Sequence, residues 1–125
     1  MEYAEQFIGY ALKTCSTMQE LTDRRAREKH NRAMRSLHML QREQMYTAPD
    51  RCADTALQLM AHPDARVRLS AAAYCLQAEV HQEQALVCLQ QLQQHGPTPM
   101  IRTNAEMCVM GCVPFSRQQP TADQQ

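Results

Sequence analysis

The sequence has little glycine and no tryptophan. Only three of its 125 residues are glycine. Loops that cradle a phosphate need glycine where the backbone must approach the ligand closely, and neither a Walker fingerprint nor a dinucleotide-binding fingerprint occurs in the chain. Serine and threonine are few, and none stands in the glycine-rich elbow of a hydrolase. These absences argue against an enzyme, and we expect no catalytic residues.

Net charge is also absent, because thirteen basic residues balance thirteen acidic ones. A chain without net positive charge lacks the general electrostatic attraction of a nucleic-acid-binding protein. No apolar run approaches the ~20 residues that a membrane-spanning helix needs. The acidic start at Glu2 and Glu5 is not followed by the apolar segment of a secretory signal. We therefore expect a cytoplasmic protein with no membrane partner.

The six cysteines and five histidines form no metal-binding or disulfide pattern. A disulfide framework requires an oxidising compartment, and the N-terminus does not indicate one. The chain has neither the Cys-x-x-Cys spacing of a zinc knuckle nor a His-Glu-x-x-His motif. We expect free, buried thiols, no metal and no cofactor.

What the sequence does contain is helical periodicity. Apolar residues recur at steps of three and four, and no segment alternates as a strand would. This pattern predicts an all-α array of about six helices stacked as antiparallel pairs, in one domain over 1–115. The polar segment 116–125 is predicted to be disordered. The expected helices cover about 3–17, 23–45, 50–60, 64–78, 81–95 and 99–111.

Each expected helix has one apolar face that should pack in the core. Residues expected to point inward include Phe7, Leu12 and Cys15, then Ala33, Leu37 and Leu40, then Cys52, Ala56 and Leu57, then Val67, Ala71 and Tyr74, then Ala85, Leu89 and Leu92, and finally Ile101, Ala105, Val109 and Cys112.

The segment 62–76, HPDARVRLSAAAYCL, resembles the second helix of a HEAT repeat. Asp64 follows Pro63 and can cap the helix. Val67 and Ala71 then fall on its core-facing side, four residues apart. The resemblance implies a HEAT-like helical-repeat array.

A wider stretch, about 29–111, is similar to a bacterial family of short HEAT-like proteins associated with polymorphic toxins. The residues that carry this similarity are Asn31, Val67, Arg68, Ala71, Ala72, Cys75, Leu76, Ala85, Leu89, Ala105, Met107 and Gly111. The similarity implies an immunity-type protein that binds and neutralises a cognate toxin or effector domain by protein–protein contact. The family has no catalytic residues to transfer to this chain.

Two charged sets are the candidate partner-binding residues. If the toxin acts on nucleic acid, its cleft is basic, and an inhibitor would present carboxylates to it. The acidic candidates are Asp50, Asp54, Glu79 and Glu83. If the target is acidic, the candidates are Arg24, Arg27, Arg32 and Arg35.

The basic helix 23–45 leaves other interpretations open. Its cations can form a solvated surface with pairs such as Arg24 and Glu28, four residues apart. The alternative function is a helical-repeat adaptor or a nucleic-acid-binding module, although the lack of interleaved aromatic residues argues against single-stranded nucleic acid. The nine methionines suggest core filling, and any exposed subset would make an adaptable docking surface.

Overall fold

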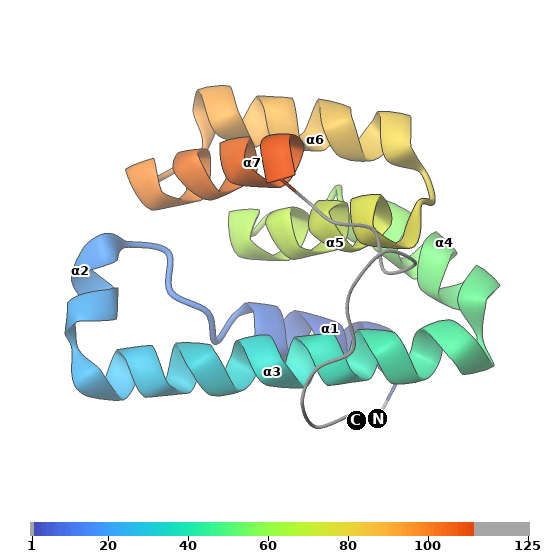
Figure 1. The fold of residues 1–125 in the computed structure, drawn as a ribbon, viewed down its shortest axis with the longest axis horizontal. Coiled ribbons are helices and arrows are strands. Elements are labelled where there is room, and N and C mark those ends of the chain that lie inside the picture. Colours follow the sequence, from blue (N-terminus) through green and yellow to red (C-terminus); the bar gives the residue numbers. More distant parts are fainter. Residues whose placement is uncertain (1, 112–125) are drawn as a thin grey trace.

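The computed structural model describes residues 2–111, and helices are the only regular secondary structure within them. The all-α prediction is confirmed. Figure 1 shows three layers, with α1 and α3 on one side, α5 in the middle, and α6 and α7 on the other side. The helices are α1 (Tyr3–Ala11), α2 (Met18–Thr22), α3 (Arg24–Thr47), α4 (Pro49–Leu59), α5 (Ala65–Ala78), α6 (Gln82–His95) and α7 (Pro99–Gly111). The predicted disordered tail at 116–125 lies outside the described residues.

The first predicted helix is shorter than expected, and this is why seven helices replace six over 2–111. The chain leaves the helix after Ala11, where the Thr14 hydroxyl donates to the Ala11 carbonyl oxygen at 2.6 Å. The Thr17 hydroxyl oxygen then caps α2 by accepting from the Glu20 N–H at 3.1 Å. Threonine side chains that bond the local backbone compete with helix continuation. The prediction of one helix over 3–17 is therefore wrong, and Leu12 is exposed rather than buried.

Two of the later helices, α3 and α5, start at aspartate caps that the sequence contains. Asp23 accepts from the Ala26 N–H at 2.9 Å and so begins α3. Asp64 accepts from the Arg66 N–H at 2.9 Å and begins α5. The turn into α6 needs left-handed backbone at Glu79 and His81, whose φ angles are 57° and 46°. Aspartate caps were visible in the sequence, whereas the two left-handed residues were not.

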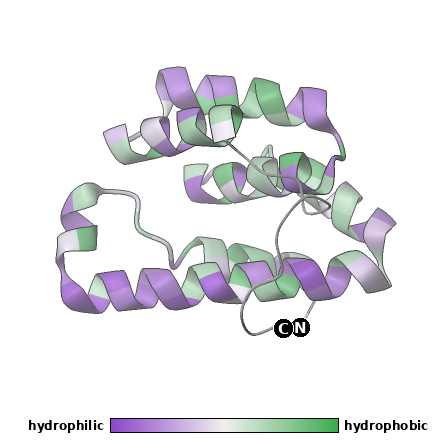
Figure 2. Ribbon diagram, in the orientation of Figure 1, coloured by the Kyte–Doolittle hydropathy of each residue, from purple (hydrophilic) through white to green (hydrophobic). Residues whose placement is uncertain are grey.

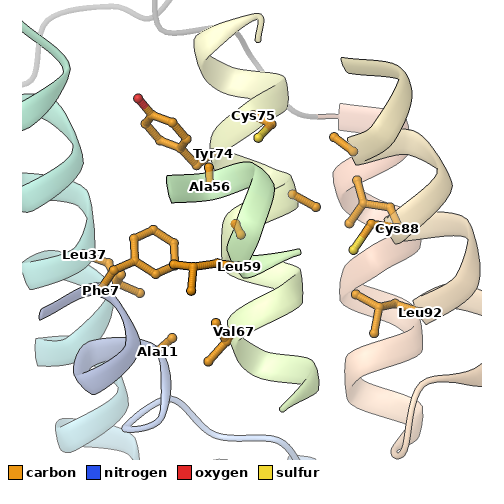
Figure 3. Close-up of a cluster of buried hydrophobic side chains, with 14 of the residues drawn as sticks. Phe7, Ala11, Leu37, Ala56, Leu59, Val67, Tyr74, Cys75, Cys88 and Leu92 are labelled. Carbon is orange, nitrogen blue, oxygen red and sulfur yellow. The ribbon is translucent and has the colours of Figure 1, made fainter. Parts of the chain in front are cut away.

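The core runs through all three layers around α5. Figure 3 shows Phe7 and Leu37 beside Leu59, with Val67 below them on α5. The inward orientation of Val67, Ala71 and Tyr74 is confirmed, since none is more than 1% exposed. The outer helix α3 differs from this buried core. Figure 2 shows hydrophilic residues along its whole length.

Two further inward predictions are wrong. In α4 the buried residues are Cys52, Ala56 and Leu59, which leaves Leu57 exposed on the flank of the helix. In α7, Ile101 and Ala105 are buried, whereas Val109 is exposed. The outer helices are covered along a single narrow stripe, so apolar residues at its margin stay in solvent.

Four of the five described cysteines agree with the expected burial, whereas Cys108 is only partly buried. Cys15, Cys52, Cys75 and Cys88 are buried free thiols. Burial raises the pKa of Cys75 to about 12, so that its thiol stays protonated. Cys112, which was expected to point inward, lies outside the described residues. No helix within 2–111 is long and apolar enough to cross a membrane.

Ala71 tests the packing around α5. Its side chain is fully buried, so Ala71→Leu should overpack the helix contacts and lower the free energy of unfolding by about 1–3 kcal/mol. Ala73→Leu is the matched control, because Ala73 lies two residues along the same helix and only half-buried. Chemical denaturation measures both variants. Equal midpoints for the two variants would contradict this orientation of α5.

Candidate functional site

A groove with a volume of ≈ 570 Å³ lies between α3, α5, α7 and the loop after α1. We call it the α5 groove, because one face of α5 forms its floor. Its volume is within the roughly 300–1,000 Å³ typical of ligand sites. The lining residues are Thr14, Cys15, His30, Met34, Arg66, Leu69, Ser70, Ala73, Gln77, Ile101, Asn104, Met107, Cys108 and Gly111.

The floor of the groove is a regular stripe on α5. Arg66, Leu69, Ser70, Ala73 and Gln77 line it, and their spacing of three and four residues places them on one helical face. The helices α1, α4, α6 and α7 all pack against α5. The stripe is the face of α5 that these contacts leave open. Its centre carries small side chains, so another backbone could approach it closely.

Two exposed methionines stand at the sides of the groove. Met34 comes from α3 and is 48% exposed, and Met107 comes from α7 and is 63% exposed. The same two helices carry Met39 and Met110, which are 69% and 79% exposed but do not line the groove. A flexible thioether adapts its shape to whatever packs against it. Core filling, the use that the sequence suggested for methionine, is wrong for these four residues and for Met18, which is also exposed. Of these five exposed methionines, only Met34 and Met107 line the groove.

The loop that closes one end of the groove is held by Arg66. Its guanidinium donates to the Leu12 carbonyl oxygen at 2.8 Å and to the Thr14 carbonyl oxygen at 3.3 Å. The same group forms an ion pair with the Asp64 carboxylate at 2.9 Å. That hydrogen-bonded arginine lowers the pKa of Asp64, which keeps its carboxylate charged.

A second tie joins this loop to the start of α7. The Thr98 hydroxyl donates to the Ser16 carbonyl oxygen, while its oxygen accepts from the Ile101 N–H at 3.2 Å. The loop is therefore fixed to both α5 and α7. This fixed wall makes the groove a preformed feature of the fold.

His30 supports the same loop and is not arranged for catalysis. Its Nδ1 accepts from the Cys15 N–H at 2.9 Å, so the ring proton of the neutral form belongs on Nε2. Burial lowers the pKa of His30 and raises the pKa of the Cys15 thiol. A cysteine nucleophile needs a stabilised thiolate, and this pair has the opposite properties. Within 2–111, no three His, Cys, Asp or Glu side chains lie close enough to hold a metal ion.

The acidic candidates do not gather in one site. Asp50 and Asp54 are exposed on α4, and Glu79 is exposed at the end of α5. Glu83 lines a second hollow of ≈ 460 Å³ between α4 and α6, which the other three do not line. That hollow also contains the apolar Leu57 and Val87.

The basic candidates are all exposed on α3, but they differ in their surroundings. Arg24 forms an ion pair with Glu28 at 3.1 Å, as the sequence suggested. Arg27 donates to the Leu21 carbonyl oxygen at 3.4 Å. Arg32 lines a hollow of ≈ 350 Å³ whose other residues include Lys13, Lys29 and Tyr10. Arg35 does not line that hollow.

Sequence reasoning missed most of the α5 groove. Its residues come from four separate segments. The HEAT-like segment 62–76 supplies most of the floor, but that resemblance did not mark these positions as a site. Two signals were present: the run Ala71, Ala72 and Ala73, which indicated close approach to α5 on more than one side, and the excess of methionine. Neither signal showed which side of α5 would remain open.

Comparisons with protein-family models, with curated proteins and with solved structures gave no match. The HEAT-like and immunity-family resemblance therefore remains a prediction.

His30 gives the loop a dependence on pH. Because the folded state lowers its pKa, its contribution to stability is present above about pH 6.5, the usual histidine value, and declines as the pH falls below it. The difference in free energy of unfolding between wild type and His30→Gln should therefore be larger at pH 7.5 than at pH 5. Urea denaturation at both values measures it. A difference that does not change with pH would contradict the neutral, hydrogen-bonded His30.

Proposed function

We propose that this protein is an immunity-type binding protein that neutralises a cognate bacterial toxin domain by contact and has no catalytic activity of its own. The resemblance of 29–111 to the toxin-associated HEAT-like family suggests this role. The observation that supports it most is the α5 groove, whose sides carry the exposed Met34 and Met107. We place this function in the cytoplasm, where the buried thiols would remain reduced.

The chemistry of the groove favours recognition over catalysis. Thr14 uses its hydroxyl on the Ala11 carbonyl oxygen, and His30 uses Nδ1 on the Cys15 backbone. Ser70, Gln77 and Asn104 remain as polar groups on a mainly apolar surface. Apolar walls with a few hydrogen-bonding groups are typical of binding sites. An occupied groove would hold the toxin against one side of the helical array.

The alternative function, a nucleic-acid-binding module, has one supporting observation. The hollow between α1 and α3 brings Tyr10 next to Lys13, Lys29 and Arg32, and the Lys13 ammonium lies 5.9 Å from the Tyr10 ring centroid. The basic helix has no aromatic residue of its own at this point, and α1 supplies one. Cations beside an aromatic ring are features of single-strand binding.

Coexpression with a candidate toxin domain taken from a neighbouring gene tests the main proposal. Wild type should rescue growth, and Met34→Glu should weaken the rescue because it places a charge at the side of the groove. Met39→Glu is the matched control on the same helix, and it should rescue as wild type does. Both positions are solvent-exposed, so neither variant should lose its fold.

Absence of rescue by a folded wild-type protein would contradict the inhibitor function. Equal rescue by the two variants would leave inhibition standing but move the contact away from the groove.

The double variant Lys29→Glu, Arg32→Glu tests the nucleic-acid-binding alternative. If this double variant fails to rescue growth while the methionine variants rescue it, and wild type binds single-stranded RNA in a salt-dependent manner, the basic hollow is the functional surface.

A further inference from the structure

The α5 groove has the form of a site for one helix. Its floor runs from Arg66 to Gln77, which at 1.5 Å per residue corresponds to about 16 Å, or three helical turns. The floor lies between two helices, α3 and α7, which supply the side walls. An amphipathic helix that lays its apolar side into such a groove is a common mode of protein recognition.

The side chains along the groove fit that shape. Ser70 and Ala73 are small and stand at the middle of the floor, so the backbone of a guest helix could lie close to α5. Met34 and Met107 could then close over its apolar side chains from the two sides. Gln77 and Asn104 are available for hydrogen bonds at the margins.

The charges around the groove indicate the polar side of the guest. None of the described residues that line it is acidic. The half of α3 that forms one wall, 24–35, contains six cations and one acid, Glu28, which is paired with Arg24. Two of these cations, Lys29 and Arg32, line the separate hollow between α1 and α3 and do not line the α5 groove. Arg27 lies seven residues before Met34 and thus on the same face of α3. A guest with carboxylates toward α3 would gain complementary charge, whereas a basic guest would be repelled.

We propose that the α5 groove binds an amphipathic helix of the partner, with its apolar face on the floor and its acidic face toward α3. This inference rests on the proposed binding function and specifies its partner segment. A second copy of this chain and a compact apolar small molecule are the competing occupants.

The test uses the full chain with ¹³C-methyl methionine and two synthetic helical peptides of 14 residues. The peptides share one face of leucine and alanine and differ only in carrying glutamate or lysine on the other. The acidic peptide should shift the Met34 and Met107 methyl signals in a saturable way and bind at least tenfold more tightly than the basic one. Met39, which is on the same helix as Met34 but does not line the groove, should not shift.

Two variants connect these shifts to the groove. Ala73→Phe fills the floor and should abolish saturable binding, and Met107→Glu, at an exposed position, should weaken it even if Ala73→Phe does not fold. No binding by the acidic peptide at millimolar concentration, equal binding of both peptides, or shifts at Met39 would overturn the inference. Shifts of Met34 and Met107 on dilution without peptide, together with a dimeric mass, would assign the groove to a second copy.

The toxin assay keeps this inference distinct from the proposed function. If wild type and Met107→Glu rescue growth equally, inhibition stands and the helix-binding groove is wrong. If folded wild type fails to rescue while the acidic peptide still binds in the groove, the groove inference stands and the partner is not that toxin.

Discussion

At the start of α5, the Arg66 guanidinium is shared between the Asp64 carboxylate and the backbone carbonyl oxygens of Leu12 and Thr14. Asp64 also caps the helix through the Arg66 N–H. One pair of side chains thus begins the central helix and fixes the loop that follows α1. Because charged hydrogen bonds to otherwise unpaired carbonyls are strong, the loop has a defined position. That position separates α3 from α5 and leaves the α5 groove open.

The remaining architecture depends on this arrangement. The helices α4, α6 and α7 cover other sides of α5, where small α5 residues such as Ala72 and Cys75 are buried. The side that carries Ser70 and Ala73 has no such cover within the groove. Apolar surface with a preformed shape costs a partner little reorganisation when it binds. The core and the α5 groove therefore share one helix, on different faces.

Much of the fold could be predicted from sequence, because α4, α5 and α7 begin, and α6 ends, at residues with strong local preferences, whereas the turn from α5 to α6 carried no such signal. Pro63 and Asp64 before α5, and Gly96 and Pro97 after α6, are examples. The break after Ala11 was missed because it depends on the hydroxyls of Thr14 and Thr17, which a helical pattern of apolar residues does not register. Leu57 and Val109 were predicted to be buried but are exposed, because apolar periodicity locates the buried face of a helix only to within one residue.

The groove was less predictable than the helices, since it exists only when α3, α5 and α7 are placed together. The most direct measurement of the groove's proposed role is amide hydrogen exchange of the protein alone and in the presence of a saturating amount of the proposed toxin partner. Slower exchange in the complex is expected in the loop 12–17, in the first half of α3 and at 104–111, with α4 and the start of α6 unchanged. Protection confined to α4 and the start of α6, around Asp50, Asp54 and Glu83, would contradict binding in the α5 groove.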